Sequence, residues 1–329
     1  MNEKIKIYVT ARIAEILEKD AESFEFFKSD GRTVNKNALL TKIILNYHKE
    51  FDARQRALLE YLRSKIGSTV SVSTPKLEAL CTELSGKLSE RAASDGGKFD
   101  RLISFKPTRE TESLIAYIER YMLCGRSLSE YFRNLFSSYA EMSQDKREEV
   151  VFKPQFDAIM KSVEEGKRVF ITMKSKRVIE TAVYSVARSK EEMHCYVLTT
   201  TSKSCAPVRL SRILSVTQIA EKAEFSDDQL KIFNKMLTYG PQFFYAANEE
   251  PVEVLLSDNG MAMFRQFYVH RPMPEKIEGN IITFHCSHDQ VLQYFRRFGR
   301  QAKILSPKSV KERMYHFHRS AANSYSPEI

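Results

Sequence analysis

Tryptophan is absent from the 329 residues, and glycine, proline and cysteine are scarce, at 11, 10 and 5 residues. This composition excludes collagen-like, proline-rich and disulfide-stabilised classes of protein. The cysteines are odd in number and lack CxxC spacing, as expected for free thiols in a reducing cytoplasm. No stretch approaches the roughly 18 apolar residues that a membrane span needs, and residues 1–4 do not open a signal peptide. We therefore expect a cytoplasmic protein.

The sequence also lacks the motifs of familiar catalytic sites, since it contains no GxGxxG, Walker loop, GxSxG or HExxH. The most ligand-like cluster is His285, Cys286 and His288. His285 and Cys286 would point to opposite faces of a strand, and no second cluster completes a zinc site. We expect no metal, no cofactor and no enzymatic activity. A nuclease stays open as an alternative, because paired carboxylates far apart in sequence cannot be recognised.

The charge balance indicates an anionic partner. Lysine and arginine number 51 against 42 acidic residues, a formal net charge of +9. Nucleic acid is favoured over a membrane surface because no strongly basic amphipathic helix stands out. With 43% hydrophobic and 28% charged residues, the chain is an ordinary globular one, long enough for two or three domains.

A short phrase occurs twice, as GRTVN at 31–35 and GRSLS at 125–129. A strand-like and a helix-like pattern precede each copy, and a helix-like pattern follows it. In the first strand, residues 4–10, apolar side chains alternate with Lys6 and Tyr8. The second strand begins at Arg101 and carries Ser104 and Lys106 on its polar face. A helical insertion at about 51–97 separates the copies.

These copies resemble ribbon-helix-helix DNA-binding units, and residues 125–133 resemble the start of that family's second helix. The family pairs two strands into a ribbon that enters the major groove, and two copies in one chain imply an intramolecular ribbon. The resemblance implies that Lys6, Tyr8, Ser104 and Lys106 face bases or phosphates. The second-helix starts would then contact the nucleic-acid backbone through Thr33, Asn35, Ser127 and Ser129. The alternative interpretation is that these residues form a solvated edge of the ribbon and contact no nucleic acid.

The rest of the chain has a different pattern, which begins after a charged linker near 143–151. Closely spaced strands between 169 and 219 predict a small antiparallel barrel. A linking helix at 227–239 follows. Alternating strands and helices then predict a ferredoxin-like α+β layer. The predicted fold class is multidomain α+β, with domains at 1–145, 151–222 and 223–329.

Residues 151–320 resemble the WYL domain with its C-terminal extension. Residues 194–198 (HCYVL) lie where that family has its name-giving Trp-Tyr-Leu, with Cys195 in place of tryptophan. Residues 208–213 (VRLSRI) resemble its strand with two arginines, and residues 292–307 resemble the helix, glycine, strand and proline of the extension.

The WYL resemblance implies an Sm-like barrel that binds an anionic ligand, often nucleic acid, through basic and aromatic residues. The candidates here are Lys174, Arg177, Arg188, Tyr196, Arg209 and Arg212. Guanidinium groups pair with phosphates, and tyrosine offers a stacking surface. In the alternative interpretation, Tyr196 is a core residue and the arginines form surface ion pairs. A secondary basic patch is predicted at Arg296, Arg297, Arg300 and Lys303.

The combination of ribbon-helix-helix units, WYL domain and extension is similar to the WYL accessory proteins of type VI-D CRISPR systems. That resemblance implies a single-stranded RNA binder that stimulates an RNA-guided RNA nuclease, and we expect a homodimer formed through the C-terminal region. The runner-up is a ligand-responsive DNA-binding WYL transcription regulator, in which the ribbon reads an operator.

Overall fold

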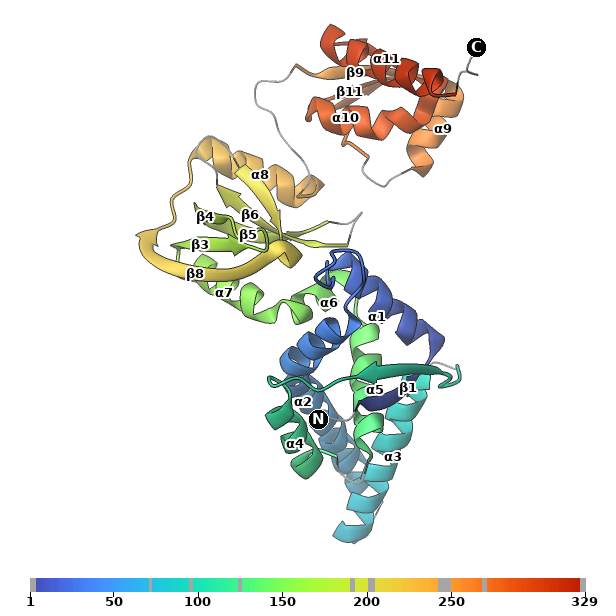
Figure 1. The fold of residues 1–329 in the computed structure, drawn as a ribbon, viewed down its shortest axis with the longest axis vertical. Helices are drawn as coiled ribbons and strands as arrows, with labels where there is room; N and C mark the ends of the chain where they lie inside the picture. Colours follow the sequence, from blue (N-terminus) through green and yellow to red (C-terminus); the bar gives the residue numbers. More distant parts are fainter. Residues whose placement is uncertain are drawn as a thin grey trace. The chain divides into compact units, whose positions relative to one another are not determined.

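The computed structural model describes residues 4–70, 73–94, 97–123, 126–189, 193–200, 205–241, 250–267 and 271–325, which form a mixed α+β protein (Figure 1). The chain divides into two compact units. The first is Met1–Ala158 with Leu210–Leu214, and the second is Ile159–Arg209 with Ser215–Ile329. Among the described helices, none is both long and apolar enough to cross a bilayer. The three predicted domain ranges stay a prediction.

A two-stranded ribbon lies at the centre of the first unit. Strands β1 (Ile5–Val9) and β2 (Arg101–Phe105) pair antiparallel, with Ile7 opposite Ile103. The ribbon predicted from the two sequence copies therefore forms within one chain. Its inner face carries the fully buried Ile7, Val9 and Phe105, as the alternation predicts.

Each ribbon strand leads into a pair of helices, and polar caps explain where these helices begin. The pairs are α1 (Ala11–Ser23) with α2 (Lys36–Thr69), and α4 (Glu112–Tyr121) with α5 (Leu128–Ala140). The side chains of Asn35 and Ser127 accept the N–H groups of Ala38 and Glu130, so they cap α2 and α5. Thr33 does not cap a helix, because it donates to Asp30 instead. Gly125, the first residue of the second copy of the phrase, lies outside the described residues.

The predicted insertion is helical. The C-terminal half of α2 packs against α3 (Thr74–Ser94) (Figure 1). An ion pair between Arg63 and Glu78 links the two helices. Cys81, on α3, is buried. This helical hairpin separates β2 from the first copy in sequence while leaving the ribbon intact.

The predicted linker near 143–151 is wrong, because that segment forms the buried helix α6 (Gln144–Val151), followed by α7 (Lys153–Glu164). Three charged residues of the run, Asp145, Arg147 and Glu148, are buried. Arg147 donates to both carboxylate oxygens of Asp20, at 2.6 and 2.9 Å, and Glu148 is fully buried. Glu148 accepts the N–H of Ser211 at 3.2 Å, within the same compact unit.

The strands between Lys167 and Lys222 form two small sheets. They are β3 (Lys167–Met173), β4 (Val178–Thr181), β5 (Val183–Arg188), β6 (Cys195–Thr200), β7 (Cys205–Arg209) and β8 (Ile213–Lys222). Their hydrogen bonds give the orders β4-β3-β8 and β5-β6-β7, so the described strands do not close the predicted barrel. The predicted strand at 178–187 breaks at the buried Ala182, where Thr181 Oγ1 donates to the carbonyl of Thr200 at 2.9 Å.

The C-terminal part contains one four-stranded antiparallel sheet, in the order β10-β11-β9-β12. The strands are β9 (Val252–Leu256), β10 (Lys276–Glu278), β11 (Ile281–Phe284) and β12 (Ala302–Ser306). Helices α9 (Asp258–Gln266), α10 (His288–Phe295) and α11 (Lys308–Asn323) pack on one face of this sheet. The order supports the predicted ferredoxin-like layer, although the short edge strand β10 was missed.

Candidate nucleic-acid interface

Tyr196 and Arg209 lie side by side on the sheet β5-β6-β7. They are directly opposite each other on β6 and β7, so their side chains share one face. Both residues are half-buried. Arg209 also donates through a terminal guanidinium nitrogen to Nε2 of the buried His194, at 2.6 Å. The site therefore combines a flat phenol ring with an anchored guanidinium.

The same sheet face packs against α8 (Asp227–Tyr239). Leu198, Cys205 and Ala187, which is directly opposite Tyr196 on β5, belong to one core cluster with Phe233 and Met236. Burial raises the pKa of the Cys205 thiol to about 11, so this cysteine is a protonated packing residue at neutral pH and a poor nucleophile. The half-buried Tyr196 and Arg209 thus lie next to this apolar core on the same face.

The other predicted WYL residues do not join this pair. Arg188 is opposite Cys195, and strand alternation places its side chain on the other face from Tyr196. Lys174 and Arg177 are exposed in the turn between β3 and β4, which belong to the other sheet.

Arg212 also departs from the predicted patch. It lies in a 3-10 turn (Leu210–Arg212) that belongs to the first compact unit, and its Nε is 3.1 Å from Glu25 Oε1. Of the two arginines in this sequence motif, Arg209 lies on the sheet, and Arg212 lies in a turn where it is paired with Glu25. The core of the candidate site is Tyr196 and Arg209, with His194 as a supporting residue.

His194 was missed as a site residue, although the sequence carried a usable signal. Period-2 alternation places His194 and Tyr196 on the same side of the chain. A histidine next to an arginine on that side can accept a hydrogen bond from it.

The predicted ribbon residues occupy the outer face of the ribbon. Lys6 is opposite Ser104, and Tyr8 is opposite Leu102. Tyr8 and Leu102 are 47% and 49% exposed, so the outer face has an apolar pair at its centre. Lys106 is exposed just after β2. Leu102 was not among the predicted residues, although alternation from Ser104 places it there.

The ribbon backbone is fixed by side chains of the second helices. Ser129 Oγ donates to the carbonyl of Lys6 at 2.8 Å, and Arg133 Nε donates to that of Tyr8 at 2.7 Å. On the other strand, Asn37 accepts the N–H of Lys106 at 2.7 Å and donates to its carbonyl at 3.0 Å. Ser129 was predicted to contact a nucleic-acid backbone, but its hydroxyl is engaged within the protein.

The predicted C-terminal basic patch is partly engaged with aromatic rings. The Arg296 guanidinium lies 4.4 Å from the centre of the Phe317 ring, and that of Arg297 lies 4.6 Å from that of Tyr294. Burial raises the pKa of Tyr294 to about 12, so the ring stays a neutral partner. Arg300 and Lys303 are exposed.

The histidine and cysteine cluster at 285–288 is dispersed. His285 Nδ1 is 3.9 Å from Glu275 Oε1, and His288 Nε2 donates to the carbonyl of Glu250 at 3.0 Å. Cys286 is buried in the C-terminal core. Within the described residues, no group of three or more histidine, cysteine or acidic side chains is placed to hold a metal ion.

Comparison with known proteins shows which fold this is. No protein-family model and no curated protein sequence matches the chain. A crystal structure of a CRISPR Cas-related protein matches with a TM-score of 0.70 and 19% identity, over 99% of this chain and 94% of that one. The chain therefore shares its fold with that CRISPR Cas-related protein over nearly its whole length.

A second solved structure, of proteasome accessory factor B/C (PafBC) of Arthrobacter aurescens, matches at a TM-score of 0.28 and 15% identity. The match covers 68% of this chain and 37% of that one, and the score is too low to indicate a shared fold.

Proposed function

We propose that this chain is a non-enzymatic, cytoplasmic accessory protein that binds single-stranded RNA and stimulates the RNA-guided RNA nuclease of a type VI-D CRISPR system. The neighbouring Tyr196 and Arg209 carry the proposal. A base stacks on the tyrosine ring, an interaction worth roughly 1–3 kcal/mol per base. The guanidinium pairs with the adjacent phosphate.

Two further observations support this function. The net charge of +9 supplies long-range attraction for a polyanion. The shared fold with a CRISPR Cas-related protein, together with the resemblance to WYL accessory proteins, gives the CRISPR context. The same resemblance is the basis for proposing a homodimer through the C-terminal region.

The ribbon favours a second candidate function, a ligand-responsive DNA-binding transcription regulator. A two-stranded antiparallel ribbon fits the major groove, and its outer face exposes Lys6, Tyr8, Ser104 and Lys106. In this version the Tyr196 and Arg209 site binds the anionic effector, and the ribbon reads an operator.

Binding at one fixed salt concentration separates the two functions. Fluorescence anisotropy of the full chain is measured with single-stranded RNA and with duplex DNA selected from a random pool by binding to the protein. The RNA function predicts tighter binding of the RNA, and the regulator function predicts much tighter binding of the selected duplex. The chain should also raise the RNA cleavage rate of a purified type VI-D nuclease. An unchanged rate would contradict the accessory function, and metal-dependent cleavage by the chain alone would contradict the non-enzymatic one.

A further inference from the structure

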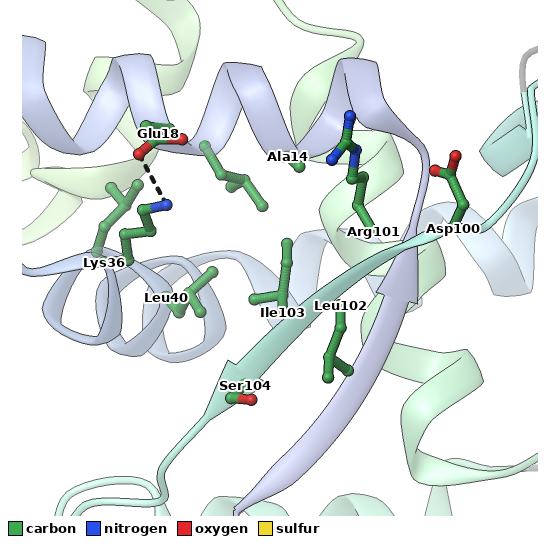
Figure 2. Close-up of a pocket in the computed structure, with 11 residues that line it drawn as sticks. Ala14, Glu18, Lys36, Leu40, Asp100, Arg101, Leu102, Ile103 and Ser104 are labelled. Atoms are coloured by element: carbon green, nitrogen blue, oxygen red, sulfur yellow. Dashed lines mark ion pairs between the residues drawn. The ribbon is translucent and has the colours of Figure 1, made fainter.

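The first compact unit contains a pocket of about 440 Å³ between α1, the start of α2 and β2 (Figure 2). Its floor is apolar and is formed by Ala14, Leu17, Leu39, Leu40 and Ile103. On the helical side of the rim, Lys36 Nζ and Glu18 Oε1 form an ion pair at 2.8 Å. An apolar floor with a few polar groups at its rim is typical of small-molecule sites.

The two copies of the unit line their pockets with different side chains. The residues that precede the first helices, Thr10 and Thr111, occupy equivalent positions in the two copies. Counted from them, Ala14 of the first copy corresponds to Ile115 of the second. The first copy therefore has a smaller side chain at this place in the lining.

A second replacement has the same effect. Counted from the caps Asn35 and Ser127, Leu40 corresponds to Phe132, whose ring packs against Phe105 at 6.1 Å. The groove at the equivalent place in the second copy has a volume of about 510 Å³, is lined by Ile115 and Leu128, and does not include Phe132. A floor that includes both Leu39 and Leu40 is therefore particular to the first copy.

The strand side of the rim carries an acidic residue, Asp100, and next to it the cation of Arg101. Arg101 is exposed at the start of β2, and in Figure 2 its side chain extends toward α1 above the floor. Within the part of the chain that the structure describes, no carboxylate forms an ion pair with Arg101. Ile5 occupies the equivalent place in the lining of the second groove. The exposed guanidinium of Arg101, like the floor that includes Leu39 and Leu40, is therefore a feature of the first copy.

We infer that this pocket binds a small amphipathic carboxylate, with its apolar body on the floor and its carboxylate on Arg101. A guanidinium pairs with a carboxylate through two parallel hydrogen bonds, and Lys36 on the opposite rim is already paired with Glu18. The occupant would lie against β2, the strand that exposes Leu102 and Ser104 on the ribbon's outer face. The site does not depend on the proposed RNA-binding function.

Calorimetric titration of the full chain with 4-phenylbutyrate, and with the uncharged 4-phenylbutanol as a matched probe, tests this site. We expect saturable binding of the carboxylate and at least tenfold weaker binding of the alcohol. Arg101→Gln should weaken carboxylate binding at least tenfold and leave alcohol binding unchanged, since it removes only the charge-assisted hydrogen bonds. Arg109→Gln, an exposed arginine outside the pocket lining, is the control and should bind like the natural chain.

Two variants give the first copy the side chains of the second. Ala14→Ile and Leu40→Phe should each fill the floor and abolish binding of both probes, with folding checked by thermal melting. If one of them fails to fold, the other decides. When the natural chain is titrated with 4-phenylbutyrate, the methyl NMR signals of Leu39, Leu40 and Ile103 should shift. The absence of saturable carboxylate binding, undiminished binding by folded Arg101→Gln, or methyl shifts confined to residues outside the pocket would each overturn the inference.

Discussion

Arg147 of α6 and Asp20 of α1 form a bidentate ion pair in the interior of the first unit, with Nε 2.6 Å from Oδ2 and a second nitrogen 2.9 Å from Oδ1. The Tyr139 hydroxyl also donates to Asp20 Oδ2, at 2.8 Å. Burial, and then the Asp20 charge, raise the pKa of Tyr139 well above its ordinary value. The phenol therefore remains a donor to the carboxylate.

Replacing Arg147 by leucine should destabilise the first unit by about 3–5 kcal/mol, because Asp20 would be left as an uncompensated buried charge. Urea denaturation followed by circular dichroism measures this loss. The control is Lys146→Leu, which removes an exposed lysine paired with Glu149 and should cost less than about 1 kcal/mol. Equal losses in the two variants would contradict the role assigned to the buried pair.

Asp52 should make stability depend on pH. Its Oδ1 accepts the Tyr131 hydroxyl at 3.0 Å, while Oδ2 is buried without a hydrogen-bond partner. Burial raises the pKa of Asp52 although the Tyr131 bond opposes the shift. The protonated form is thus favoured in the folded state. This contribution to stability is complete below the ordinary pKa and is lost as the pH rises through the raised one.

Asp52→Asn should remove that dependence while keeping an oxygen to accept the Tyr131 hydroxyl. The free energy of unfolding of Asp52→Asn, relative to that of the natural chain, should therefore increase as the pH is raised from about 4 to about 7. Denaturant titrations at several pH values give the difference. A difference that stays constant across this range would show that Asp52 titrates alike in the folded and unfolded states.

The ribbon residues distinguish the two candidate functions. Lys6→Ala and Lys106→Ala should each reduce the salt slope of duplex DNA binding by about one if the ribbon contacts phosphates. Neither change should alter binding of single-stranded RNA in the preferred function. Lys49→Ala, at an exposed position on α2, serves as the control. Equal loss of RNA binding in the two ribbon variants would place the RNA on the ribbon.

The two arginines of the WYL-like motif should differ in effect. Arg209→Gln should weaken RNA binding and make its salt dependence shallower by about one charge, because Arg209 adjoins Tyr196. Arg212→Gln should leave both unchanged, because Arg212 and its ion-pair partner Glu25 both belong to the first compact unit, whereas Arg209 belongs to the second. Salt-dependent anisotropy titrations compare them. A larger loss of RNA affinity in Arg212→Gln than in Arg209→Gln would indicate that the RNA binds outside this sheet.

The sequence was most informative where local periodicity decides the structure. Alternating apolar residues around Ile7 and Phe105 were enough to predict the ribbon and its faces, because a strand with one buried face has a strongly specified register. The break at Ala182 was missed because the alternation continues through it. It depends on contacts with Thr200, which lies on another strand.

Long-range polar partners were the main source of error. The run at 143–149 looks like a solvated linker because the buried partner of Arg147 is Asp20, in a distant helix. The same reason separates Arg212 from Arg209, since Glu25 lies far away in sequence. A sequence pattern records the charge of a residue and not the partner that it meets in the fold.

The affinity of the Tyr196 variants for single-stranded RNA tests the central claim most directly. Tyr196→Ala should weaken binding by roughly ten- to a hundredfold, because it removes a stacking surface worth about 1–3 kcal/mol. Tyr196→Phe, which keeps the ring, should bind within about twofold of the natural chain, with equal thermal stability in all three proteins. RNA affinity that is unchanged in a folded Tyr196→Ala variant would contradict the account.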